Sequence, residues 1–86
     1  MKPTISKHAA ERQAERGITE VGIRAILASS ATAFLPSNTD PEVAIVLGKY
    51  KSNVWAVLLN VETLNVITVR RASKKEVKYY EQKTGN

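Results

Sequence analysis

The chain has 86 residues, with 13 Lys and Arg, 8 Asp and Glu and one His, which gives a formal net charge of +5. This length allows one domain over residues 1–86, and the lack of Cys together with a single His excludes disulfides and leaves no ligand set for a metal or other cofactor. No apolar run is long enough to span a membrane and no secretory signal is visible, so a cytoplasmic location is expected.

The first predicted helix covers residues 7–16, a stretch rich in strong helix formers with Thr4 or Ser6 as its cap. Gly17 is suited to end this helix in a left-handed conformation. Steps of four residues place three polar side chains along one side of it: His8, Arg12 and Arg16. These three side chains can therefore face the sheet or a cleft. The alternative is a His8 without a role at the helix start and arginines that pair with Glu on the surface.

The remainder of the chain predicts a second helix, a sheet and a final helix. Thr19 caps a helix from Glu20 to about Ala28. Runs of β-branched and large apolar residues predict strands over 43–47, 54–61 and 66–70, with 31–35 as a candidate fourth and 48–53 as a hairpin loop. Ser73 and Glu76 form a capping-box pattern that opens a helix through about Gln82. The predicted fold is α+β: two N-terminal helices, a three- or four-stranded antiparallel sheet and a C-terminal helix.

A basic segment follows the last predicted strand. Residues 70–83 contain six Lys and Arg against two Glu, which is the pattern of a surface that binds phosphates. The cations are Arg70, Arg71, Lys74, Lys75, Lys78 and Lys83. Alternation along the strand points Arg70 and Arg71 to opposite faces, and helical spacing puts Tyr80 in the core and leaves Tyr79 more exposed. A solvated basic helix without a partner is the alternative.

The closing segment VITVRRASKKEVKYYE, residues 66–81, resembles the final strand and helix of BrnT-type toxins from bacterial toxin–antitoxin modules. The matching positions are Arg70, Arg71, Ala72, Ser73, Glu76, Tyr80 and Glu81. The opening segment SKHAAERQAERGIT, residues 6–19, is similar to a related family of small domains of unknown function. Its pattern is matched by His8, Ala9, Arg12, Arg16, Gly17, Ile18 and Thr19.

The resemblance implies a RelE-like α+β ribonuclease that works without a metal and is neutralised by a small antitoxin, encoded by an adjacent gene. Such cleavage uses the RNA 2′-hydroxyl as nucleophile and needs a proton acceptor, a proton donor and cations at the phosphate. We assign these catalytic roles to His8, Arg12 and Arg70. Binding of flanking RNA is assigned to Arg16, Arg71, Lys74, Lys75, Lys78 and Tyr79. A non-catalytic module that binds nucleic acid or an acidic protein through the same groove is the alternative, followed by a small enzyme of another class or a structural subunit.

Overall fold

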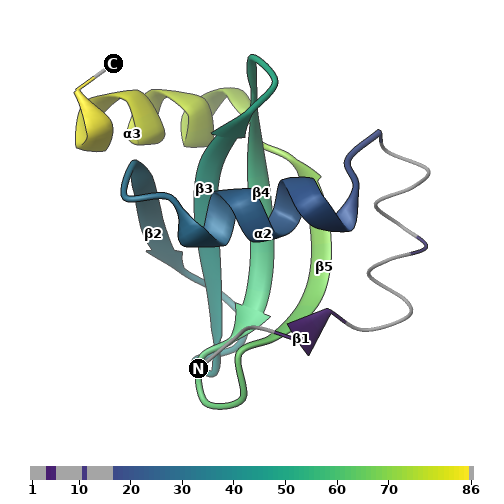
Figure 1. The fold of residues 1–86 in the computed structure, drawn as a ribbon. Helices are drawn as coiled ribbons and strands as arrows, with labels where there is room; N and C mark the ends of the chain where they lie inside the picture. The colour runs from purple at the N-terminus through teal and green to yellow at the C-terminus, as the bar shows by residue number, and fades with distance from the viewer. Residues whose placement is uncertain (1–3, 6–10, 12–16, 86) are drawn as a thin grey trace.

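A computed structural model of the protein describes residues 4–5, 11 and 17–85 (Figure 1). The elements are β1 (Thr4–Ile5), α2 (Glu20–Ala28), β2 (Thr32–Pro36), β3 (Val43–Tyr50), β4 (Asn53–Asn60), β5 (Asn65–Arg71) and α3 (Lys74–Thr84). The five strands form one sheet in the order β1-β5-β4-β3-β2. β1 runs parallel to β5 and every other neighbouring pair is antiparallel, so the sheet is mixed.

The predicted architecture is therefore wrong in its sheet and in its N-terminal part. Instead of capping a helix, Thr4 and Ile5 pair with Asn65 and Val66 and add a parallel edge strand to the sheet. Two residues have no periodicity that could reveal a strand, and this pairing is fixed by Ile5 packing against the core. Two helices, α2 and α3, are present among the described residues. The first predicted helix, over residues 7–16, lies outside this part of the chain apart from Glu11.

The other predicted segments fold locally as their patterns indicate. The Thr19 side chain accepts from the Gly22 N–H at the start of α2, and a complete capping box of Ser73 and Glu76 opens α3. The hairpin between β3 and β4 is tighter than predicted. Lys51 and Ser52 both have positive φ angles, of 50° and 71°, and these two residues alone make the turn. Left-handed residues match a two-residue turn to the twist of its strands, so both strands extend further.

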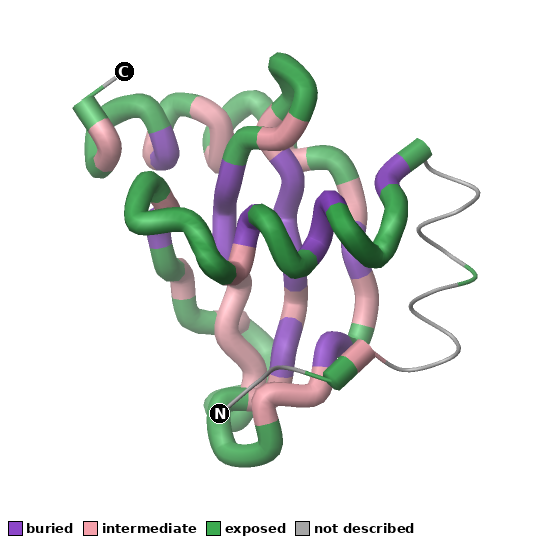
Figure 2. Tube along the Cα trace, viewed as in Figure 1, coloured by how far each residue is buried: buried purple, intermediate pink, exposed green. Residues whose placement is uncertain are grey.

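Each face of the sheet is covered by one helix. On one face, Ile23 and Ile26 of α2 pack on alternate strand residues such as Val57 and Val69, all of them almost fully buried. On the other face, Tyr80 of α3 packs on Leu47 and a small cluster of alanines. In β3, residues 46–48 are buried and residues 43–45 are half-buried (Figure 2). Leu35, Ile45 and Leu58 on the α3 face are only half-buried, so this face is less completely covered than the first.

Candidate nucleic-acid interface

Seven cations gather where the β3–β4 hairpin meets the end of β5 and the start of α3; we call this the basic end. Its members are Lys49, Lys51, Arg70, Arg71, Lys74, Lys75 and Lys78. The strand register brings these segments together, because Gly48 pairs with Trp55 and Trp55 with Arg71. The Ala72 N–H then donates to the Val54 carbonyl and fixes the start of α3 beside the hairpin. Glu76 is the one acidic residue within 48–56 and 66–78.

Aromatic rings hold two of these cations in place. The Arg71 guanidinium lies 5.2 Å from the centre of the Trp55 ring, and the Lys51 ammonium 5.5 Å from the centre of the Tyr50 ring. Trp55 is 3% exposed, so its ring is a fixed platform on which Arg71 itself stays exposed. A cation held over an aromatic face keeps outward donors available for an anion. Arg71 is therefore a preorganised phosphate donor on the α2 side of the sheet.

Arg70 points to the opposite face and is bound to Glu76. Its two terminal nitrogens donate to the Glu76 carboxylate at 2.6 and 2.9 Å. The hydrogen bonds from Arg70, followed by that from the Ser73 N–H, lower the pKa of Glu76 despite its burial, and the same pair raises the pKa of Arg70. This geometry makes Arg70 a tie between β5 and α3. The prediction that neighbouring Arg70 and Arg71 point to opposite faces is confirmed.

The remaining predicted binding residues lie along α3. Lys74, Lys75 and Lys78 are exposed in its first turns. Tyr79 is half-buried, donates its hydroxyl to the Phe34 carbonyl at 3.1 Å and has the Lys83 ammonium 5.5 Å from its ring centre. Tyr80 is buried, as predicted. The assigned His8, Arg12 and Arg16 lie outside the described residues, so their distance from Arg70 is not given by the structure.

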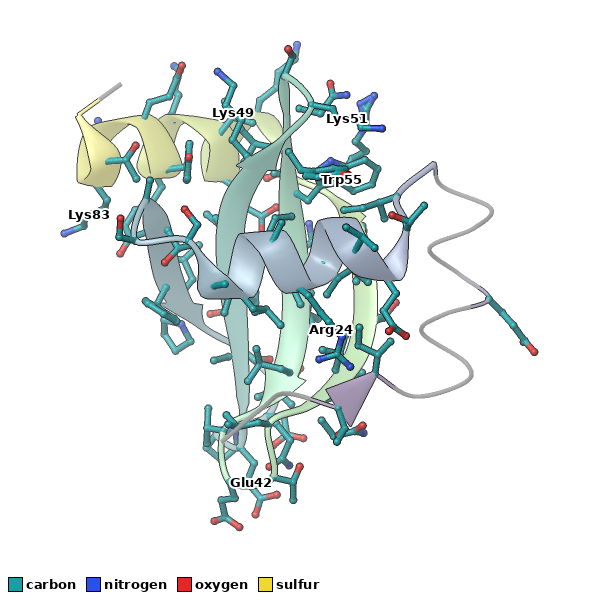
Figure 3. The ribbon with its side chains drawn as sticks, viewed as in Figure 1. Arg24, Glu42, Lys49, Lys51, Trp55 and Lys83 are labelled. Carbon is teal, nitrogen blue, oxygen red and sulfur yellow. The ribbon has the colours of Figure 1, made fainter. Side chains whose placement is uncertain are left out.

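The opposite end of the sheet is acidic. Asp40 and Glu42 lie in the β2–β3 loop and Glu62 in the β4–β5 loop, and the Val61 N–H donates to the Glu42 carbonyl, which joins the two loops. Residues 36–47 and 57–65 contain no Lys or Arg. Figure 3 shows Lys49 and Lys51 at one end of the molecule and Glu42 at the other. Charge is thus separated along the strand direction.

Sequence reasoning missed Lys49, Lys51 and their aromatic neighbours. The signal was present as GKYKSN, a basic turn between two apolar strands. This turn lies beside residues 70–75 because of the register between β3, β4 and β5, and that register cannot be deduced from the local sequence.

Two classes of site have no support in the described part of the chain. No group of three or more His, Cys, Asp or Glu there could hold a metal ion. None of its helices is long and apolar enough to cross a membrane. Comparison of the chain with protein-family models, curated proteins and solved structures found no match.

Proposed function

We propose that the protein binds RNA through the basic end and acts there as a metal-independent ribonuclease toxin. The observation that supports binding is the separation of charge among the described residues: seven cations with one acidic residue lie at one end of the sheet, and the segments 36–47 and 57–65 at the other end contain no Lys or Arg. A phosphate backbone is attracted by such a local excess, since each neutralised phosphate releases counterions. RNA as the substrate, the toxin role and an adjacent antitoxin gene come from the resemblance in the opening and closing segments. A cytoplasmic location is also part of this proposal.

In this proposal the described residues bind the RNA backbone. Arg71, held on Trp55, offers a planar donor to one phosphate, and Lys49 and Lys51 extend the positive surface along the hairpin. Three of the five N–H groups of Arg70 are used within the protein, two by Glu76 and one by the Arg71 carbonyl. The other two are the donors through which it can act on a phosphate. Proton transfer is assigned to His8, with Arg12 as second phosphate ligand.

Salt dependence of RNA binding tests the interface. Replacing Lys74, Lys75 and Lys78 together with Ala should weaken binding of a single-stranded RNA and reduce the slope of log K against log salt by up to about 2, since each lost phosphate contact removes about 0.7. The control is Arg24→Gln, a cation on α2 that lies 3.4 Å from Glu20. Equal slopes in the triple variant and the wild type would remove this helix from the interface.

Inducible expression in a bacterium tests the enzymatic part. The wild type should arrest growth and fragment cellular RNA, and His8→Gln should abolish both while leaving RNA binding within a factor of two. Co-expression with the adjacent small protein should restore growth. RNA binding with intact RNA and normal growth would favour the alternative, a non-catalytic binding module.

A further inference from the structure

On the face of the sheet that α3 crosses, the half away from α3 has an apolar surface that no helix of the described residues covers. Leu35 of β2, Ile45 of β3 and Leu58 of β4 are half-buried side chains on this face; we call them the apolar strip. Register aligns them directly across the sheet, because Leu35 pairs with Ile45 and Ile45 with Leu58. Thr68, which pairs with Leu58, continues the row into β5. A row of three apolar side chains on neighbouring strands that stays partly exposed is a surface suited to a partner.

α3 covers only the upper half of this face, at the basic end (Figure 1). Besides the Arg70–Glu76 ion pair, three hydrogen bonds hold it in position: the Ala72 N–H to Val54, the Tyr80 hydroxyl to Ala31 and the Tyr79 hydroxyl to Phe34. Phe34 lies within β2, nearer to the apolar strip than Ala31, which precedes β2, so the side of α3 that carries Tyr79 faces the apolar strip. A second helix laid beside α3 on that side would complete the layer that α3 begins.

The border between α3 and the apolar strip is positively charged. Lys83 lies over the Tyr79 ring on this side of the helix and extends downward from α3 in Figure 3. Arg70 stands at the other end of the same border, where its side chain is 38% exposed beside Glu76. An occupant with carboxylates along the edge that faces α3 would meet both cations.

A second copy of this chain does not fit the surface. If two copies packed face to face with their basic ends together, the two α3 helices, each about 10 Å thick, would hold the sheets about 20 Å apart. The apolar strips of the two copies would then not touch. If the basic end of one copy lay against the acidic end of the other, the outer face of α3 would lie on the apolar strip of the other copy. That face carries Lys75, Lys78 and Gln82, all exposed, which would have to lie against leucine and isoleucine.

We infer that the apolar strip binds an amphipathic helix of an acidic partner protein, which lies alongside α3 with its carboxylates toward Arg70 and Lys83. Four strands span about 14 Å, so the helix needs about 10–14 residues, similar to the 11 residues of α3. Its apolar residues at three- and four-residue spacing would cover the strip. The apolar strip lies on the opposite face of the sheet from Arg71, and its border shares Arg70 with the proposed RNA site. The inference does not require that the basic end binds RNA.

Selection from a displayed peptide library tests the inference. The library consists of 16-residue helix-forming peptides with apolar residues at helical spacing and Glu, Lys, Gln or Ser at the flanking positions, selected on the purified protein. Enriched peptides should carry net negative charge along one border of the apolar stripe. A second library with the apolar positions scrambled should give no enrichment.

Neighbouring residues of β2 give a matched pair of variants. Leu35→Thr removes an apolar contact from the strip, whereas Phe34→Thr removes a residue that is 65% exposed on the opposite face. Thr keeps strand propensity in both cases. Leu35→Thr should weaken the selected peptides about five- to tenfold, and Phe34→Thr less than twofold. Lys83→Glu should weaken them about threefold. Amide spectra of each variant check that the fold is retained.

Several outcomes would overturn the inference. These are enrichment of basic peptides, enrichment from neither library, equal losses in Leu35→Thr and Phe34→Thr, and a protein dimer that Leu35→Thr dissociates in sedimentation. Loss of peptide binding in the Lys74, Lys75 and Lys78 variant without loss in Leu35→Thr would place the peptide on the RNA-binding surface instead. RNA binding measured on Leu35→Thr separates failure of this inference from failure of the proposed function.

Discussion

Arg70 and Arg71 are adjacent in sequence and have different roles in the structure. Arg71 lies on Trp55 and faces outward, whereas Arg70 joins the end of β5 to the first turn of α3 through Glu76. Alternation along a strand predicts the opposite faces. It does not predict the partners, because Trp55 and Glu76 reach these arginines through strand register and the path of the chain after Ala72. The sequence therefore identifies the two arginines, and the fold determines that Arg71 faces outward while Arg70 binds Glu76.

Glu76 has two functions that one substitution can test together. Its carboxylate accepts from Arg70 and from the Ser73 N–H, which closes the capping box of α3. Glu76→Gln keeps the shape but loses the charge, so it should lower the free energy of unfolding by about 1–2 kcal/mol at neutral pH. Urea unfolding followed by circular dichroism measures this loss. The control is Glu81→Gln, an exposed position on the same helix, which should change stability by less than about 0.5 kcal/mol.

The difference between Glu76→Gln and the wild type should depend on pH. The folded protein lowers the pKa of Glu76 below its ordinary value of 4.5, chiefly through the hydrogen bonds from Arg70. A carboxyl with a lowered pKa stabilises the fold fully above its unfolded pKa and loses that stabilisation as the pH falls through the folded pKa. The two proteins should therefore differ most above about pH 5 and converge in more acidic solution. A constant difference down to pH 2 would contradict the ion pair.

At the scale of elements, the sequence predicted what local chemistry determines. Dense β-branched runs mark β3, β4 and β5, and the caps Thr19 and Ser73 mark the starts of α2 and α3. β1 could not be predicted, since its two residues become a strand only by pairing with β5. The mixed character of the sheet follows from that one pairing. The part of the candidate site on α3 was predicted, because its cations are close together in the sequence. The part on the β3–β4 hairpin was missed, because only strand pairing brings it beside α3.

Two glycines allow α2 to lie close to the sheet. A Cβ on Gly22 would lie 2.8 Å from side-chain atoms of Ile18 and Tyr50, and a Cβ on Gly48 would clash with Ile26. Helix propensity alone predicts that Gly22→Ala stabilises the protein by about 1 kcal/mol. The contacts predict the reverse for both positions, because an added methyl in a packed interface costs about 1–3 kcal/mol.

Thermal unfolding of the alanine variants distinguishes the two expectations. Gly22→Ala and Gly48→Ala should both lower Tm by several degrees, as ΔΔG values of this size do in a domain of 86 residues. The comparison is Gly85→Ala, which meets no atom within 4 Å and has a φ of 77°. Its cost is that of the left-handed backbone alone, about 1 kcal/mol. An increase in Tm for Gly22→Ala would mean that α2 lies further from β3 than described.

At the scale of the whole molecule, the net charge does not describe how the charges are distributed between the two ends of the sheet. The +5 total describes a moderately basic protein, yet among the described residues the basic end alone holds seven cations and one acidic residue, a local excess of six. The two ends are about 20–25 Å apart along eight-residue strands. That distance exceeds the Debye length of about 8 Å at physiological salt, so each end acts on a ligand independently.

Moving charge between the ends at constant net charge tests this property directly. A variant with Lys49→Glu, Lys51→Glu, Asp40→Lys and Glu42→Lys keeps the net charge at +5 but removes two cations from the basic end. It should bind single-stranded RNA at least tenfold more weakly than the wild type at 150 mM salt, since local phosphate contacts are lost and the distant lysines are screened.

The matched control carries only Asp40→Lys and Glu42→Lys; its basic end is intact, and it should bind at least as tightly as the wild type. All four positions lie in loops or at strand ends, so circular dichroism should show an unchanged fold. If affinity instead follows net charge, with the fourfold variant equal to the wild type, RNA binding is a property of the whole surface and the basic end is not its site.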